Sequence, residues 1–137
     1  MKKFLLVSFL LVGSLMFVGT NLAVAQQTLP AGGNSFETAV KLEPGNYKGG
    51  ATGEDQELYY YVQVKAGQQL KSKLKLEGAL WNMAIFDENK EEITSDFGDD
   101  LQLDWLTNAN KSLYKYYIKI SSNEWEVDSF SLEISLL

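Results

Sequence analysis

The side chains that are able to do chemistry in this sequence are carboxylates and aromatic rings, because its 137 residues include no histidine and no cysteine. Nucleophilic schemes that pair serine or cysteine with histidine are therefore excluded, as are zinc sites built from histidine and cysteine. Paired carboxylates can still perform acid–base chemistry on a glycan. The densest set is Asp96, Asp99, Asp100 and Asp104, but it falls in or beside a predicted solvated loop. We therefore expect no enzyme.

Aromatic residues are the second group of interest, with three tryptophans and seven tyrosines. Trp81 and Trp105 lie in alternating apolar runs and are predicted to pack in the core. Trp125 lies in the acidic sequence NEWE between the last two predicted strands. Its ring is predicted either to stack on a sugar or a peptide, or to cover an open end of the fold.

Tyr60, Tyr114 and Tyr117 are predicted to line an outer sheet face, with the tyrosines next to them on the opposite face. Outward tyrosines are typical of binding surfaces, although strands also carry them for cross-strand packing alone. Together with Trp125, these three tyrosines are the candidate ligand-binding residues.

Residues 1–25 have the layout of a secretory signal peptide. Two lysines precede an apolar run over residues 4–18, and Ala23-Val24-Ala25 provides the small residues that signal peptidase reads. The apolar run is shorter than the ~20 residues of a membrane-spanning helix, which disfavours an uncleaved anchor. Cleavage is expected before Gln26, giving a secreted or periplasmic protein with no membrane insertion after cleavage.

The charge of the mature chain narrows the partner class. Cleavage removes two lysines and no acid, so the net charge falls from −6 to −8, and the sequence has no arginine. An acidic surface without arginine disfavours nucleic acid and anionic membranes. It is compatible with cations, glycans or basic protein surfaces, so the expected partner is an extracellular protein or polysaccharide.

Period-two alternation predicts the elements that position these side chains. Residues 69–76 read QLKSKLKL, which directs leucines and Ser72 to one face and lysines to the other. The aromatic and β-branched run 59–64 precedes them across a polar turn. Further alternating or extended runs are predicted at 38–42, 47–50, 79–87, 91–94, 101–106, 114–121 and about 130–134, with an acidic loop at 96–100.

These runs predict one all-β domain. The expected fold is a single antiparallel β-sandwich of about eight strands, with jelly-roll or Greek-key-like connections. Residues 26–33 are polar and contain glycine, and are expected to form a flexible leader. The domain itself is expected to span residues 34–137.

Several motifs of the mature chain carry a family resemblance. They are NSFETA at 34–39, L-x-PG-x-Y-x-G at 42–49, Asp55 before a Tyr-Tyr pair, VKAGQ-x-L at 64–70, WNMAIFD at 81–87, YYIKI at 116–120 and SFSLEI at 129–134. With them the chain resembles the bacterial pre-peptidase C-terminal domain, which is related to the collagen-binding domains of secreted bacterial collagenases.

The resemblance implies a jelly-roll-like β-sandwich that is not itself catalytic. The family domain usually follows a secreted protease, whereas this chain contains no protease, so any enzyme that it serves is expected to be a separate polypeptide. Some relatives bind calcium near the first strand. Asn34 and Asp55 match those positions, whereas Leu58 replaces a common aspartate. Glu37, Glu54 and Glu57 are the acids that could substitute for it, and Asn34, Asp55 and Glu57 are the candidate calcium ligands. Calcium is therefore a possible cofactor, with ordinary surface acids as the alternative.

The expected function is that of a secreted, non-catalytic binding module that attaches to an extracellular polymer or a partner protein. The alternative is an accessory domain for secretion or stability, acting on a separately encoded protease or envelope protein.

Overall fold

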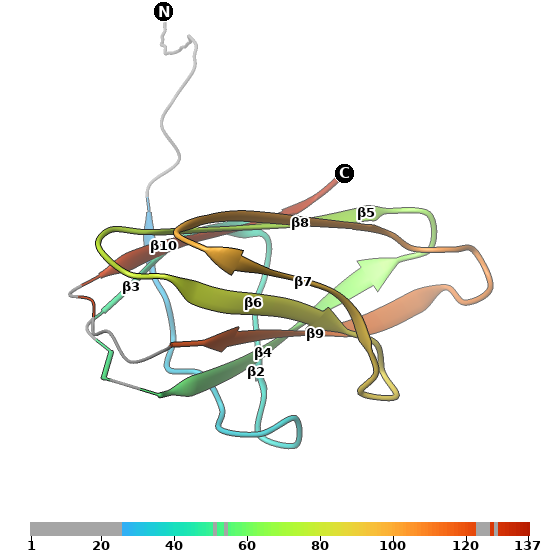
Figure 1. Ribbon diagram of the computed structural model, residues 1–137. Helices are drawn as coiled ribbons and strands as arrows, with labels where there is room; N and C mark the ends of the chain where they lie inside the picture. Colours follow the sequence, from blue (N-terminus) through green and yellow to red (C-terminus); the bar gives the residue numbers. More distant parts are fainter. Residues whose placement is uncertain (1–25, 51, 54, 123–126, 128) are drawn as a thin grey trace, which may run out of the picture.

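The computed structural model describes residues 26–50, 52–53, 55–122, 127 and 129–137. The predicted signal peptide and Trp125 lie outside the described residues. The described part contains ten strands in two five-stranded sheets and no helix (Figure 1). The all-β sandwich is therefore confirmed, with ten strands instead of about eight. None of the residues described belongs to a helix long and apolar enough to cross a membrane.

The two sheets pack face to face. Sheet A has the order β1 (Gln27–Thr28), β3 (Gly45–Gly49), β10 (Phe130–Leu136), β5 (Gln69–Leu76) and β8 (Asp100–Leu106). Sheet B has the order β2 (Val40–Lys41), β4 (Glu57–Lys65), β9 (Leu113–Ser121), β6 (Trp81–Phe86) and β7 (Glu92–Gly98). The chain crosses from one sheet to the other at most of its connections, as in a jelly roll.

The sheets are mixed, which corrects the prediction of a purely antiparallel sandwich. β1 runs parallel to β3, with Gln27 opposite Tyr47, and β2 runs parallel to β4, with Val40 opposite Tyr60. Both are two-residue edge strands. Each is separated from its partner by another strand of the opposite sheet, so no hairpin forces the pair to be antiparallel.

The predicted alternation along β5 is confirmed. Leu70, Ser72 and Leu74 are fully buried between the sheets, and the lysines of the same strand lie on the outer face of sheet A. There Lys73 forms an ion pair with Glu133 of β10, at 3.9 Å. The largest fully buried side chain is Trp81 of β6, which packs on Phe130 with ring centroids 5.2 Å apart.

Two buried serines differ in their hydrogen bonds. Among the described residues, the Ser72 hydroxyl has one hydrogen-bond partner, the Met83 sulfur, at 3.3 Å. The Ser122 hydroxyl accepts a hydrogen bond from the backbone N–H of Gln56 at 2.7 Å and donates one to the backbone carbonyl of Gly53 at 3.0 Å. Ser72→Ala should change the free energy of unfolding by less than about 0.5 kcal/mol, whereas Ser122→Ala should lower it by about 2 kcal/mol. Urea unfolding of both variants checks this, and equal losses would contradict it.

Residues 26–33, expected to be a flexible leader, lie against the sandwich. Leu29 is buried and donates its backbone N–H to the Lys48 carbonyl at 3.0 Å. Gly33 exchanges two backbone hydrogen bonds with Tyr59, each 3.0 Å long. The described part of the domain therefore begins before residue 34.

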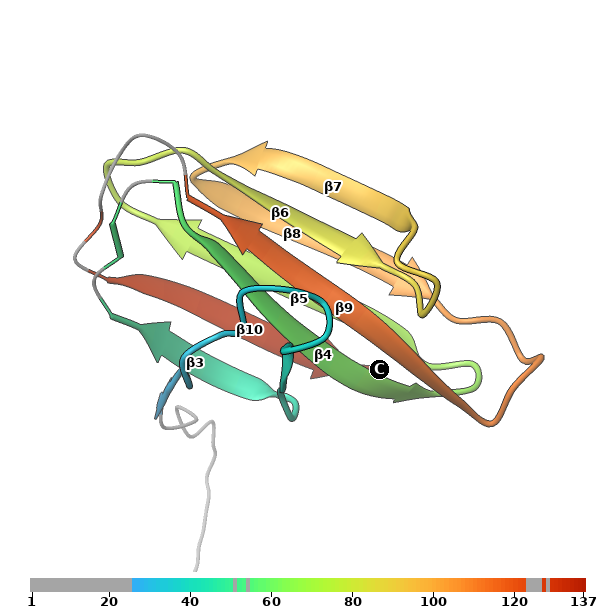
Figure 2. The same ribbon diagram turned by 90° about the horizontal axis from the view of Figure 1, so that it is seen from below.

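Two connections lie at the same end of the sandwich in both views (Figures 1 and 2). One is the turn at residues 87–91 between β6 and β7, and the other is the loop at residues 107–112 between β8 and β9. The acidic stretch 96–100, expected to be a loop, instead forms the end of β7, a tight turn and the start of β8. This β7–β8 connection links the edge strands of the two sheets.

Candidate functional site

Tyr60 does not lie on an outer face, which corrects its prediction as a ligand-binding residue. It is 1% exposed and sits opposite Ile118 on the inner face of sheet B. Its hydroxyl donates a hydrogen bond to the Pro30 carbonyl at 2.8 Å. The Tyr60 side chain therefore holds residues 26–33 against the end of the core, and it is too buried to contact a ligand.

Burial gives Tyr60 a pH-dependent role in stability. It raises the pKa of Tyr60 to about 12, above the ~10 of an unfolded tyrosine. The stabilisation by the neutral phenol is therefore complete below pH 10 and is lost as the pH rises from 10 through 12. We expect wild type to lose about 2 kcal/mol more than Tyr60→Phe over this range, measured by urea unfolding. Parallel profiles for the two proteins would contradict this.

Tyr117 lies on the predicted outer face of sheet B, but that face is covered by the chain itself. Phe36 makes edge-to-face contacts with Tyr59, Phe86 and Tyr117, each with ring centroids 5.0 Å apart. Tyr117 is consequently only 6% exposed. The nearby Lys115 ammonium lies 5.0 Å from the Tyr117 ring centroid. The predicted tyrosine surface is thus a packed aromatic cluster.

Tyr114 belongs to the opposite face of β9 from Tyr117, because residues three apart on a strand project to opposite sides. It lines a pocket of about 350 Å³ at the end of the sandwich where the two connections meet. We call this cavity the end pocket. Its walls are the 87–91 turn, the 107–112 loop, and the ends of β8 and β9.

The base of the end pocket is aromatic. Tyr114 and Tyr116 stack with centroids 5.9 Å apart and an interplanar angle of 12°. Trp105, at the end of β8, donates its indole N–H to the Tyr116 hydroxyl at 3.1 Å. Burial, which outweighs the hydrogen bond from Trp105, raises the pKa of Tyr116. Trp105 and Tyr114 remain partly exposed, so their rings are accessible from the pocket.

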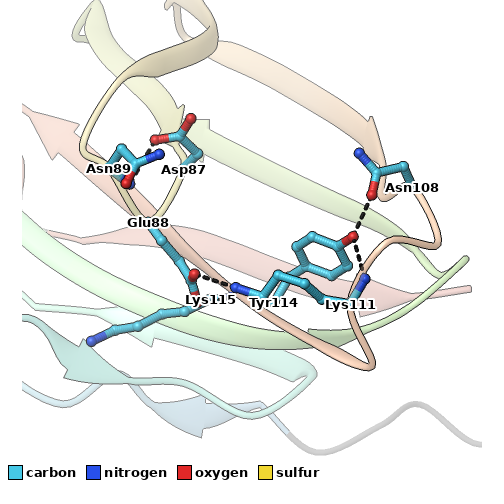
Figure 3. A network of polar contacts seen from close by, with 7 residues as sticks. All are labelled: Asp87, Glu88, Asn89, Asn108, Lys111, Tyr114 and Lys115. Atoms are coloured by element: carbon cyan, nitrogen blue, oxygen red, sulfur yellow. Dashed lines mark hydrogen bonds and ion pairs between the residues drawn. The ribbon is translucent and has the colours of Figure 1, made fainter.

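Glu88 connects the two polar walls of the pocket (Figure 3). Its Oε2 accepts the backbone N–H of Lys115 at 3.2 Å, and its Oε1 pairs with the Lys111 ammonium. This hydrogen bond to Glu88 raises the pKa of Lys111. The Lys111 ammonium also lies 5.3 Å from the centroid of the Tyr114 ring. Glu88 therefore connects the 87–91 turn to the 107–112 loop and to the start of β9.

Two polar side chains present unused groups at the pocket rim. Asp87 Oδ1 accepts the backbone N–H groups of Asn89 and Glu91, at 2.8 and 3.0 Å. Asn108 Oδ1 accepts the Tyr114 hydroxyl and the Asn110 backbone N–H. Within the part of the chain that the structure describes, Asp87 Oδ2 and Asn108 Nδ2 have no hydrogen-bond partner. At the rim, Asp87 thus offers a free acceptor and Asn108 a free donor, and the exposed side chain of Asn89 also lines the pocket.

Of the residues that form this pocket, only Tyr114 was predicted to bind a ligand. Trp105 was predicted to pack in the core, and its alternation with Leu101 and Leu103 gives no sign that its ring lines a pocket. Asp87 and Asn108 are of residue types that are common in turns, so their sequence positions do not mark them as binding residues. Only the tertiary structure brings the two turns to one end of the sandwich.

Of the three residues predicted to bind calcium, Asn34 and Glu57 are engaged by neighbouring side chains, and Asp55 is exposed in the turn before β4. Asn34 Oδ1 accepts the Thr38 hydroxyl at 3.1 Å. Glu57 pairs with Lys119 at 3.1 Å and accepts the Tyr59 hydroxyl at 3.2 Å. The described residues contain no cluster of three or more acidic side chains able to hold a metal ion. Calcium binding at Asn34, Asp55 and Glu57 remains a prediction.

The carboxylates considered for catalysis are spread over the β7–β8 connection and β8. Asp100 and Asp104 lie on the outer face of sheet A, opposite Lys75 and Lys71 of β5. Asp96 Oδ1 accepts the backbone N–H of Phe97 at 2.8 Å, on β7. These acids do not converge on a common cavity among the described residues. Charged side chains on edge strands also discourage pairing with other chains.

Comparison with known proteins identifies relatives in fold. No protein-family model and no curated protein matches the sequence. Among solved structures, the chain is similar to PliG of Aeromonas hydrophila, a periplasmic lysozyme inhibitor of g-type lysozyme. The identity is 22% and the TM-score 0.56, with 72% of this chain and 95% of that chain covered.

A second similar structure is the pre-peptidase C-terminal domain of a collagenase from Bacillus anthracis. The identity is 14% and the TM-score 0.57, with 70% of this chain and 93% of that chain covered. The two share a fold. The predicted resemblance to the pre-peptidase C-terminal domain is thus confirmed at the level of architecture. The Yersinia pseudotuberculosis-derived mitogen is also similar, with 15% identity, a TM-score of 0.53 and coverage of 68% and 86%.

Proposed function

We propose that this protein is a secreted or periplasmic, non-catalytic binding module that attaches to an extracellular polymer through the end pocket. The observation that carries the proposal is the pairing of accessible aromatic rings with free polar groups in one cavity, at Trp105, Tyr114, Asp87 and Asn108. Ligand pockets commonly combine an apolar or aromatic surface with a few polar groups that orient the ligand.

The rigidity of the pocket also supports this proposal. The aromatic base is formed by the ends of β8 and β9, within the two sheets, and the Glu88 contacts join the two connections above it. A preformed site loses less conformational entropy on binding than a mobile loop does. The structural relatives include a periplasmic lysozyme inhibitor, which is compatible with an extracytoplasmic location.

A partner protein is the second candidate, and exposed apolar residues favour it. Phe97 and Leu80 are 48% and 46% exposed. Phe97 lies opposite Asn82 in the β6–β7 register, and Leu80 precedes Asn82 by two residues. The two apolar side chains therefore occupy neighbouring positions away from the end pocket, where a separately encoded protease or envelope protein would bind.

Pull-down of the mature protein with collagen, peptidoglycan and insoluble polysaccharides tests the proposal. Trp105→Ala should reduce retention by at least about fivefold, because it removes an accessible aromatic surface worth about 1 kcal/mol or more. Phe97→Ala is the matched control and should be retained like wild type. Retention that depends on neither residue would overturn the proposal. Capture of a co-exported protein that is lost only in Phe97→Ala would favour the second candidate. Melting curves confirm that both variants are folded.

A further inference from the structure

We propose that the end pocket receives a single uncharged, hydroxyl-bearing sugar ring, so that the polymer is a neutral polysaccharide. This inference rests on the proposed function and specifies its ligand class. Three features support it: the free hydrogen-bond donor of Asn108, the free acceptor of Asp87, and two nearby lysines whose ammonium groups already contact other side chains.

The free polar groups match hydroxyls better than they match ions. The backbone N–H of Asn110 can only donate, so the atom of Asn108 that accepts it is Oδ1, and the free atom is the donor Nδ2. Asp87 Oδ2 is an acceptor. In Figure 3 the side chains of Asp87 and Asn108 stand on opposite sides of the network. A hydroxyl both donates and accepts, so hydroxyls on different edges of one sugar ring can satisfy the two groups.

The charges around the pocket disfavour an ionic ligand. Lys111 is paired with Glu88, and the Lys115 ammonium lies 4.4 Å from the Tyr61 ring centroid on the outer face of sheet B. Neither lysine is therefore free to bind a uronate or phosphate, which would meet the Asp87 carboxylate instead. A cationic ligand would satisfy Asp87 but would leave the Asn108 donor facing a positive charge. An uncharged ligand avoids both costs.

The size and surface of the pocket agree with one ring. Its volume of about 350 Å³ lies near the lower end of ligand pockets, which span roughly 300 to 1,000 Å³. The apolar C–H face of a pyranose can pack on the partly exposed rings of Trp105 and Tyr114, while its hydroxyls reach the rim. The two connections that border the pocket lie at one end of the sandwich (Figure 2), so further units of a chain can continue from the pocket into solvent.

Calorimetric titration with soluble oligosaccharides tests the inference. The probes are a neutral gluco-oligosaccharide, a neutral manno-oligosaccharide, an oligogalacturonate and a chitosan oligosaccharide. We expect a neutral probe to bind, and Asn108→Asp to weaken it about tenfold, because this variant keeps the oxygen that accepts from Tyr114 but replaces the donor with an acceptor. Lys73→Ala, on the outer face of sheet A, is the control and should bind like wild type.

Three outcomes would overturn the inference: no heat with either neutral probe at millimolar concentration, tighter binding of a charged probe, or unchanged affinity in Asn108→Asp. If Trp105→Ala still loses retention on an insoluble polymer in those cases, the proposed function stands and only the ligand class is wrong. If retention is independent of Trp105 as well, both fail.

Discussion

Replacing Trp81 with alanine should lower the free energy of unfolding by about 3 to 5 kcal/mol, the cost of a large cavity in a core. Trp81 is fully buried between the sheets and packs on Phe130 with centroids 5.2 Å apart. In a domain of roughly 110 residues, whose total stability is on the order of 5 to 15 kcal/mol, this loss leaves the fold marginal. Urea unfolding monitored by circular dichroism measures it.

Trp81→Phe is the informative control. Among the described residues, the Trp81 indole N–H is buried without a hydrogen-bond partner, which costs about 1 to 3 kcal/mol. Phenylalanine removes this donor while it keeps an aromatic ring, so the two effects offset each other and the net loss should stay below about 1.5 kcal/mol. A loss as large as that of the alanine variant would show that the indole N–H is satisfied.

Replacing Gly49 with alanine should destabilise the protein by about 3 kcal/mol through overpacking. Gly49 of β3 lies directly opposite Phe130 of β10, and a methyl group at this position would come within 2.2 Å of the Phe130 ring. The ring cannot move freely, because Trp81 packs on it. The neighbouring Gly50 is exposed and has no atom within 4 Å of such a methyl group.

Gly50→Ala is thus the matched control, and it should remain within about 0.5 kcal/mol of wild type. Thermal and urea unfolding of the two alanine variants measure the difference. Combining Gly49→Ala with Phe130→Leu should recover part of the loss of the single variant, because the smaller side chain vacates the space that the methyl group needs. Equal stabilities of Gly49→Ala and Gly50→Ala would refute the proposed contact.

Much of the architecture follows from local sequence patterns. Alternation in β5 correctly assigned Leu70, Leu74 and even the polar Ser72 to the buried face, because a strand alternates its faces strictly. The same periodicity identified the longer strands of both sheets. It missed β1, because a two-residue strand is too short to show a period, whereas β2 lies inside the run predicted at 38–42. Both strands owe their position to pairing with β3 and β4.

The candidate site was decided by the tertiary structure. Period-two alternation cannot tell which face of an aromatic strand becomes the core, so Tyr60 was assigned to the wrong side, and Phe36 closed the surface around Tyr117. The absence of histidine and cysteine, which excludes whole classes of chemistry, is a property of the sequence alone. The end pocket is not, because Asp87 and Asn108 line it only where the β6–β7 turn and the β8–β9 loop come to the same end of the sandwich.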